Sequence, residues 1–379
     1  MEFKINVFEL QTIFSKLSHV VRMTEGNFTS MIMVESKDGG VVFKATDGTN
    51  ILMITAQSDQ CELISEGKTL LKFADVRNYV MRFVPLVDTY GTKEFHVIAN
   101  DAESMIKSTT TFPSGKPSHR RLKLATFNAD GYPAIVKSFD EAQLVMNSNV
   151  FKRGIGRVLH CINPNEVRKA MTGVCVTLMD DKIVFAGTNG IKLADFEFPI
   201  NADIHHKSYI FSYNFASTLR NVLDDDAQVF MKLDEGRFGY VKSNNIYMIG
   251  NLIVGDSFPD YKNMFELTNV VSVPRLDFYD SVRTVLDVLD TEDNSRLSIN
   301  ISGNQLSLKS TKSEFTQEFD AEFETSLDVD VNGLFFESLL KDFIGSTIEL
   351  WFSPSANYIV MRSSESPNHT ALITLVKRR

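Results

Sequence analysis

Residues 165–200 read N-E-V-R-K-A-M-T-G-V-C-V-T-L-M-D-D-K-I-V-F-A-G-T-N-G-I-K-L-A-D-F-E-F-P-I. The second half of this stretch predicts two apolar strands around the polar pair Asp180-Asp181, a break at Thr188-Asn189-Gly190 and a further strand. The same order of strand, polar turn, strand and Thr-containing break recurs at residues 30–51 and 296–312. One pattern that occurs three times in a chain predicts a repeat architecture.

Six amphipathic segments, two in each repeat, are predicted to be helices. They cover residues 7–23, 72–83, 150–162, 214–223, 276–289 and 334–343. Alternating segments between them are typical of antiparallel strands. The sequence therefore predicts an α+β protein, built as three tandem copies of a domain with two helices and an antiparallel sheet. We place these domains at residues 1–135, 136–266 and 267–379.

Composition restricts the class of protein. The 379 residues are 43% hydrophobic, which is ordinary for a soluble chain of two or three domains. Apolar runs stay short of the roughly 18 residues of a membrane span, and the first residues lack signal-peptide character. Three cysteines without a C-x-x-C spacing fit a reducing cytoplasm. The net charge of −9 argues against an openly basic nucleic-acid binder, but it permits positive charge confined to one surface.

Catalytic motifs are missing from the sequence, which has no G-x-x-x-x-G-K-[ST], G-x-G-x-x-G or G-x-S-x-G. Adjacent His205 and His206 cannot share one face of a regular element, so we interpret them as loop residues rather than metal ligands. Cys161 lies on the apolar side of its predicted helix and is interpreted as core rather than as a partner of His160. The run 224–226, all aspartate, is interpreted as a solvated loop, with a cation site as the alternative. We expect no enzymatic activity, no metal and no cofactor.

Three stretches of the chain resemble the bacterial-type DNA sliding clamps, the beta subunit of the DNA polymerase III holoenzyme. Residues 165–194 resemble a segment in which the family usually has T-D-G-H-R-L. F-P-D-Y at residues 258–261 matches the motif that closes the family's second domain. L-K-L-A-T-F-N-A-D-G-Y-P at residues 122–133 resembles the linker between its first two domains. The order of predicted helices and strands agrees over essentially the full chain.

The resemblance implies a head-to-tail homodimeric ring with the DNA clamp fold, a processivity factor that encircles duplex DNA. The helices of such a ring line the hole, and their phosphate contacts are independent of sequence and sensitive to salt. The third domain should contribute least, because its helices are rich in aspartate. The alternative is that the basic residues form ordinary solvated helix faces. The residues expected to bind DNA are Lys16, Arg22, Arg77, Arg82, Lys152, Arg153, Arg157, Asn165, Arg168, Lys169, Arg220, Arg283 and Lys341.

The resemblance also implies an apolar pocket between the second and third domains, where short peptides of the polymerase and the clamp loader bind. The matching positions are Thr188, Gly190, Lys192, Leu193, Pro259, Met264, Phe335, Ile373 and Leu375. The alternative is that the leucines and the isoleucine of this set are plain core residues. Ring closure would pair an edge strand near Leu122 and Leu124 with the third-domain region around Leu289 and residues 296–301.

The chain departs from the family at several positions. Asn189 and Ile191 replace the usual aspartate and histidine, and the end L-I-T-L-V-K-R-R lacks a finish like Met-Pro-Met-Arg-Leu. These departures suggest a divergent clamp and leave a viral origin open, with the cytoplasm of a bacterium or of a phage-infected host as the expected location. The alternative function is a replication accessory protein that binds nucleic acid without forming a ring.

Overall fold

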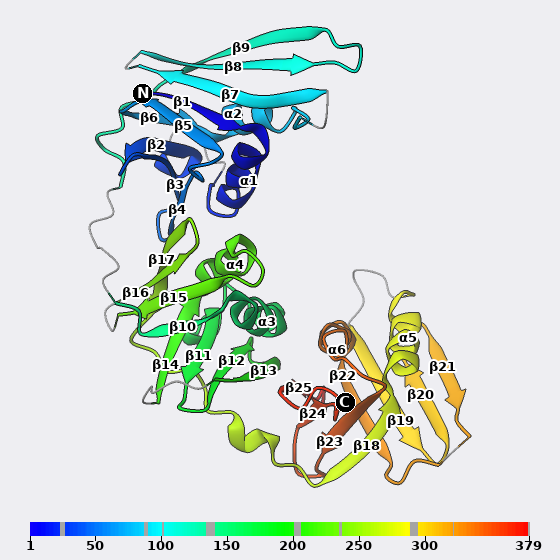
Figure 1. Cartoon of the computed structure of the whole chain (residues 1–379). Helices are drawn as coiled ribbons and strands as arrows, with labels where there is room; N and C mark the ends of the chain where they lie inside the picture. The colour runs from blue at the N-terminus through cyan, green and yellow to red at the C-terminus, as the bar shows by residue number, and fades with distance from the viewer. Residues whose placement is uncertain are drawn as a thin grey trace. The chain divides into compact units, whose positions relative to one another are not determined.

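The computed structural model of the chain describes residues 1–22, 27–86, 90–100, 102–133, 141–200, 206–234, 237–288, 295–320 and 322–377. The chain passes three times through one order of elements: a strand, a helix, a set of strands, a second helix and three further strands (Figure 1). This order confirms the prediction of three α+β copies with two helices each. The domain boundaries themselves stay a prediction, and the first of them falls at residues outside the described part of the chain.

The helices lie where the sequence predicts them, two in each copy. Their bounds are α1 Val7–Leu17, α2 Phe73–Val80, α3 Ser148–Val158, α4 Tyr213–Val222, α5 Arg275–Leu286 and α6 Gly333–Leu340. Asparagines cap helices in different copies: Oδ1 of Asn6 accepts the amide of Phe8, and Oδ1 of Asn332 accepts the amide of Phe335. A cap of this kind satisfies an amide that has no partner within the helix.

Helix α1 ends at Leu17, short of the predicted end at residue 23. The amides of His19 and Val20 bond to carbonyl groups three residues earlier, and the amide of Arg22 donates to the carbonyl oxygen of Thr29. Three-residue bonds tighten the last turn, so the helix stops although the apolar pattern continues.

Strands make up the rest of each copy. The first copy contains β1 Glu2–Asn6, β2 Met31–Lys37, β3 Gly40–Thr46, β4 Ile51–Thr55, β5 Cys61–Ser65, β6 Lys68–Lys72, β7 Gly91–Ala99, β8 Glu103–Thr111 and β9 Pro117–Ala125. The second contains β10 Leu144–Asn147, β11 Gly173–Leu178, β12 Lys182–Thr188, β13 Lys192–Pro199, β14 Lys207–Ser212, β15 Gln228–Leu233, β16 Phe238–Ser243 and β17 Ile246–Ile253. The third contains β18 Asn269–Pro274, β19 Arg296–Ser302, β20 Gln305–Lys309, β21 Glu314–Glu318, β22 Leu327–Asn332, β23 Thr347–Phe352, β24 Tyr358–Arg362 and β25 His369–Thr374.

The order of hydrogen-bonded strands is the same in the three copies. The order β4-β3-β2-β6 in the first copy corresponds to β13-β12-β11-β14 in the second and β21-β20-β19-β22 in the third. Likewise β9-β8-β7-β1 corresponds to β17-β16-β15-β10 and to β25-β24-β23-β18, and the first copy adds β5 beside β1. These ladders are antiparallel. Copies that share little sequence thus share one connectivity.

The chain folds into two compact units. One consists of Met1–Lys152 and Ser217–Leu252, and the other of Arg153–Ala216 and Ile253–Arg379. Within each unit a sheet of one copy continues into a sheet of the next, because β4 pairs with β17 in the first unit and β13 pairs with β25 in the second. Pairing of this kind satisfies backbone groups that an edge strand would expose.

The Thr-containing break has the same structure in the first two copies. Oγ1 of Thr188 donates to the carbonyl oxygen of Lys192 at 2.8 Å and accepts the amide of Gly190, while Oδ1 of Asn189 accepts the amides of residues 191 and 192. Thr46, Asp47 and Gly48 form the same bonds in the first copy. Both glycines have a positive φ, 84° and 92°, which a side chain would disfavour. Asn189 therefore accepts the same backbone hydrogen bonds in the second copy as Asp47 does in the first.

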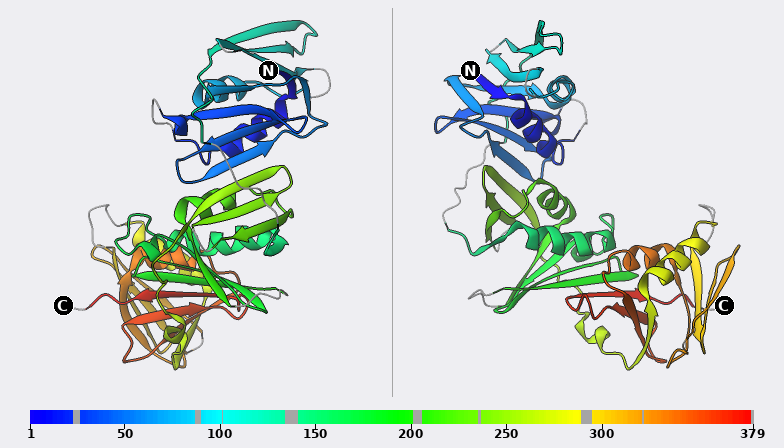
Figure 2. Two further views of the ribbon diagram at one scale, coloured as in Figure 1. Left: turned by 90° about the vertical axis from the view of Figure 1, so that its left-hand side faces the viewer. Right: turned by 45° about the vertical axis from the view of Figure 1, so that its right-hand side comes forward.

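Buried aromatic and aliphatic side chains join helices to sheets in each copy. In the third copy α5 and α6 lie side by side (Figure 2). The rings of Phe278 and Phe336 pack edge to face between them, with centroids 5.8 Å apart. Gly154 of α3 lies against the ring of Phe185, where an added Cβ would fall 2.2 Å from a ring atom. A glycine in the middle of a helix is unfavourable by itself, so this one is explained by the close approach of the helix to the sheet.

Candidate nucleic-acid and protein interfaces

Most of the residues predicted to bind DNA lie at the surface. Lys16, Arg77, Lys152 and Arg157 are half-buried, and the exposed ones are Arg22, Arg82, Arg153, Asn165, Arg168, Lys169, Arg220, Arg283 and Lys341. Arg153 and Arg157 are four residues apart on α3 and therefore share one helix face. The exposed loop that follows α3 carries Arg168 and Lys169. These groups give the second copy several cations close together in sequence.

The ion pairs divide the basic residues into two groups. Lys16 and Lys152 are paired with Asp224 and Asp225, and Arg22 lies 3.7 Å from Asp47. No ion pair within the described residues involves the others, of which the exposed ones are Arg82, Arg153, Arg168, Lys169, Arg220, Arg283 and Lys341. Residues 224–226 are largely exposed, as the sequence predicted, but two of their carboxylates bind lysines of the chain.

Helix ends give a second explanation for some of the basic residues. Arg77, Arg157 and Arg220 lie in the last turn of α2, α3 and α4. A cation there is favoured by the negative end of the helix dipole, whatever the helix binds. Arg153 and the loop residues Arg168 and Lys169 lack this explanation, and they are the sharper candidates for phosphate contacts.

The third copy presents a different helix surface. Leu276 and Leu334 are 60% and 55% exposed at the starts of α5 and α6. The guanidinium of Arg283 lies over the ring of Tyr279 at 6.0 Å, and the hydroxyl of Tyr279 donates to Glu337. This surface is apolar and acidic, in keeping with the expectation that the third copy contributes least to DNA binding.

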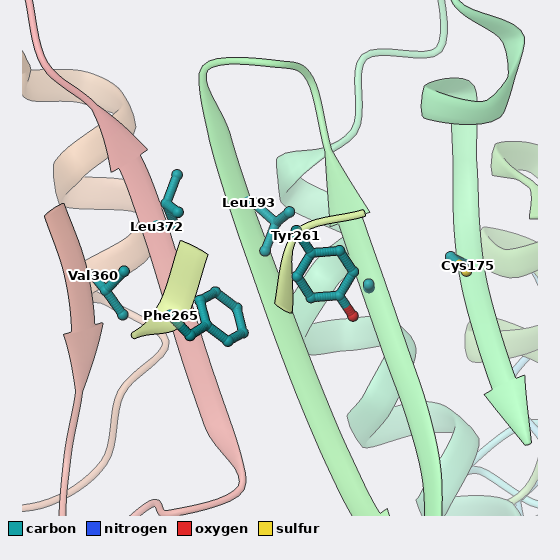
Figure 3. Packing of buried hydrophobic residues seen from close by; sticks show 7 residues of the cluster. Cys175, Leu193, Tyr261, Phe265, Val360 and Leu372 are labelled. Atoms are coloured by element: carbon teal, nitrogen blue, oxygen red, sulfur yellow. The ribbon is translucent and has the colours of Figure 1, made fainter. Parts of the chain in front are cut away.

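An apolar cluster lies where β13 meets β25 in the second unit (Figure 3). Half-buried Phe258, Met264, Leu267, Trp351 and Tyr358 surround its core. The core consists of Cys175, Ala186, Leu193, Tyr261, Phe265, Val360 and Leu372. A fully buried core with a partly exposed apolar rim is suited to bind a short apolar peptide.

A hollow of about 400 Å³ adjoins this cluster and shares Phe265 and Trp351 with it. Its polar wall includes Lys262 and Arg362, and the guanidinium of Arg362 lies 5.4 Å from the ring centre of Trp351. Apolar side chains and a few fixed polar groups therefore lie next to one another, as in peptide and ligand sites.

Buried polar groups fix the F-P-D-Y segment to β13. The hydroxyl of Tyr261 donates to Oδ2 of Asp195 at 2.5 Å, and Nζ of Lys262 lies 3.0 Å from the same oxygen and 2.8 Å from Oε1 of Glu197. Burial raises the pKa of Asp195 and of Tyr261. Burial also lowers the pKa of Lys262, but the two carboxylates outweigh it and the net shift is upward. The lysine is therefore firmly charged and anchors the segment.

The structure does not bring the predicted pocket residues onto one surface. Successive residues of a strand point to opposite faces, and Leu193 pairs with Leu372 whereas Lys192 pairs with Ile373. Leu193 and Met264 belong to the apolar cluster. Thr188 and Gly190 shape the turn, Pro259 is half-buried in the F-P-D-Y segment, and Leu375 forms a single bridge with Val331 beyond β25. Leu372, which the sequence did not single out, lies in the apolar cluster opposite Leu193, and the peptide pocket itself stays a prediction.

The opposite face of β13 carries a polar cluster that the sequence analysis missed. Nζ of Lys192 donates to Oγ of Ser338 at 2.8 Å and lies 5.0 Å from the ring centre of Phe335. Burial lowers the pKa of Lys192. On the same unit Nε2 of His160 lies 2.7 Å from Oδ2 of Asp342. Lys192 and Phe335 thus join the second copy to the third and do not form the apolar cluster.

Within the described part of the chain, two strands have no partner of the kind that their counterparts have. Strands β4, β13 and β21 are equivalent in the three copies, and so are β9, β17 and β25. Strand β4 pairs with β17 and β13 pairs with β25, so β21 and β9 are left without such a partner. Half-buried Leu122 and Leu124 lie on β9, as expected. Residues 296–301 cannot form the other edge, because β19 pairs with β20 and β22 on its two sides. Leu289 lies outside the described residues.

The two unpaired strands have opposite charge. Arg121 and Lys123 lie on the outer face of β9, and Glu314 and Glu318 lie on the corresponding face of β21. On the inner faces the half-buried side chains include the leucines and Ser118 of β9, and Phe315 and Gln317 of β21. The strands are thus complementary on both faces.

The comparisons with known proteins agree with this fold. A family model described as the central domain of the DNA polymerase III beta subunit matches residues 145–260. The beta sliding clamp of Mycoplasma capricolum is 24% identical over 96% of each chain, and that of Chlamydia muridarum is 22% identical over 94% of each. The chain is thus similar to bacterial sliding clamps over nearly its whole length, and its central part matches the family model. The solved sliding clamp of Bacillus subtilis superposes with a TM-score of 0.86 at 16% identity, and the beta subunit of Thermotoga maritima with 0.85 at 17%, each over all of both chains. The clamp fold thus holds at low sequence identity.

A few groups of the chain could suggest other chemistry, among them Cys161 and the histidines at residues 205 and 206. Cys161 is fully buried, and burial raises the pKa of its thiol to about 12, so a thiolate is disfavoured at neutral pH. The described residues contain no group of three or more side chains arranged to hold a metal ion. Among the described helices, none is long and apolar enough to cross a bilayer. His206 is exposed, and His205 lies outside the described residues.

Proposed function

We propose that the chain is a processivity factor that acts as a head-to-tail homodimeric ring around duplex DNA. The observation that carries this proposal is the pair of unmatched strands β9 and β21. Strand β9 of one protein molecule can pair with β21 of a second molecule, which gives each strand the partner that it lacks within its own chain. Two such junctions would close six domains into a ring, with the domain boundaries near residues 135 and 266. The ring would hold DNA and catalyse no reaction, so no catalytic residue is assigned.

The size of the hole follows from the helices. Two protein molecules would supply twelve helices, each about 10 Å across. Placed side by side they give a circumference of roughly 120 Å and a free opening of roughly 28 Å. A duplex passes through an opening of that width with water around it. Enclosure then keeps the ring on DNA, and the basic side chains need only weak contacts that do not depend on sequence.

We further propose that the apolar cluster binds short peptides of the replicative polymerase and the clamp loader. Half-buried Met264 and Trp351 at its rim and the adjoining polar hollow support this assignment. We expect the clamp to act in the cytoplasm at the replication fork.

Retention on DNA tests the ring. After loading by a clamp loader, the protein should stay on a closed circle and leave when the circle is cut once, because the ring slides off a free end. Arg153→Glu/Arg157→Glu should weaken loading or retention on the circle. Equal retention on circular and linear DNA would contradict the ring and favour a binder that does not enclose DNA.

A further inference from the structure

Two lysines of the helix surface contact carboxylates of the chain itself. Nζ of Lys16 on α1 lies 2.5 Å from Oδ1 of Asp224, and Nζ of Lys152 on α3 is paired with Asp225. The side chains of these lysines are only 15% and 28% exposed. Arg153, the next residue of α3, is exposed and has no ion pair within the described residues. The positive charge of the two lysines is thus already compensated.

Residues 224–226, here called the acidic turn, are held in place independently of the lysines. Oγ of Ser148 donates to the carbonyl oxygen of Asp224 at 2.7 Å, and the amide of Ser148 donates to that of Ala227 at 2.8 Å. Nδ2 of Asn149 donates to Oδ1 of Asp226. Asp226 has a φ of 54°, a conformation that costs free energy for any residue but glycine. The acidic turn is therefore a built feature and not a loose loop.

We propose that the acidic turn occupies the positions that DNA phosphates would take on Lys16 and Lys152, and so withholds these lysines from DNA. Carboxylate and phosphate oxygens are equivalent acceptors for an ammonium group, which binds either as a point charge. The inference rests on the proposed DNA-binding function. Its consequence is a ring that holds DNA through fewer phosphate contacts, which lowers both the affinity and its dependence on salt.

The alternative is a joint between the first two copies. Lys16 belongs to the first copy and Asp224 to the second, and Oγ1 of Thr218 also donates to the carbonyl oxygen of His19 across this junction. A joint would affect the thermal stability of the protein but not the salt dependence of DNA binding. The two roles are therefore separable by measurement.

The test measures binding of a labelled linear duplex by the full-length protein over a series of salt concentrations. Asp224→Asn/Asp225→Asn should bind at least about threefold more tightly at low salt, and the slope of log affinity against log salt should steepen by about 0.9 for each freed lysine. The matched control is Asp180→Asn/Asp181→Asn, which removes the same charge from an exposed turn between β11 and β12. This control should change the slope little.

Adding Lys16→Gln/Lys152→Gln to Asp224→Asn/Asp225→Asn should abolish the gain in affinity. In the parent chain, Lys16→Gln/Lys152→Gln should cost less affinity than Arg153→Gln/Arg157→Gln does. This second comparison leaves the acidic turn intact, so it holds even if the first variant folds poorly. Equal slopes for the acidic-turn variant and the control would overturn the inference while the arginine variant upholds DNA binding. If Arg153→Gln/Arg157→Gln also binds DNA as tightly as the parent chain, the proposed function itself is overturned.

Discussion

His369 shows how one buried side chain couples stability to pH. Its ring lies 4.5 Å from the ring of Phe343 and 6.2 Å from that of Phe196, and Nδ1 donates to the carbonyl oxygen of Asp195 at 3.1 Å. Nε2 is buried without a partner. The pKa of His369 is lowered to about 4, chiefly by burial and also by the nearby charges of Arg157 and His160, although the hydrogen bond to Asp195 and the charge of Asp342 act in the other direction. The folded protein therefore keeps this ring neutral.

We expect the free energy of unfolding to fall as the pH drops from about 6.5 to about 4. The unfolded chain binds the proton of His369 below its ordinary pKa and the folded chain only below about 4, so the contribution is complete above pH 6.5. The loss amounts to about 3 kcal/mol at most. Fluorescence of Trp351, the single tryptophan of the sequence, can follow unfolding by urea at several pH values. His369→Phe should flatten the dependence in this window, and an unchanged dependence in that variant would assign it to other groups.

At the scale of elements, the apolar cluster at the β13–β25 junction is the proposed peptide site. Met264 is half-buried at the rim of the apolar cluster, so Met264→Glu should place a charge where a peptide side chain would lie without disturbing the core. We expect at least about tenfold weaker binding of a short labelled peptide with two leucine anchors. Ile344→Glu is the matched control, because Ile344 is 58% exposed after α6 and outside the cluster. Similar losses in both variants would place the peptide elsewhere.

Some of this site was predictable from the strand pattern and some was not. The alternation of Leu193, Asp195 and Glu197 along β13 puts them on one face, and the sequence alone shows this. The choice between Leu372 and Ile373 depends on the register of β13 against β25, and a shift of one residue exchanges the two faces. No local pattern fixes a register between strands so distant in sequence.

The helices and the turns were predictable because their signals are local. The Thr-Asn-Gly break at Thr188 and its counterpart at Thr46 fold alike because their side chains bond to their own backbone. The pairing of Lys16 with Asp224 joins residues 208 positions apart, so inspection of either helix alone shows only a basic face and an acidic loop. The same holds for β21, whose role as an edge emerges from the comparison of the three strand orders.

At the scale of the whole molecule, two junctions inside the chain predict a third between chains. The first junction is β4 with β17, and the second is β13 with β25. The equivalent third junction would join β21 to β9 of a second protein molecule. Exposed ion pairs contribute only about 0.2–1 kcal/mol each, so the backbone ladder and the apolar inner faces must supply most of the hold. The charges then decide which edges meet and in which direction.

Charge reversal tests that choice of partner. Arg121→Glu/Lys123→Glu makes both unmatched strands acidic, and Glu314→Lys/Glu318→Lys makes both basic, so each variant alone should dimerise at least about tenfold more weakly than the parent chain. An equimolar mixture should recover dimers, because each junction of a mixed ring again joins an acidic strand to a basic one. Sedimentation equilibrium at moderate salt measures both effects. Variants that dimerise like the parent, or a mixture that stays monomeric, would show that β9 and β21 do not meet.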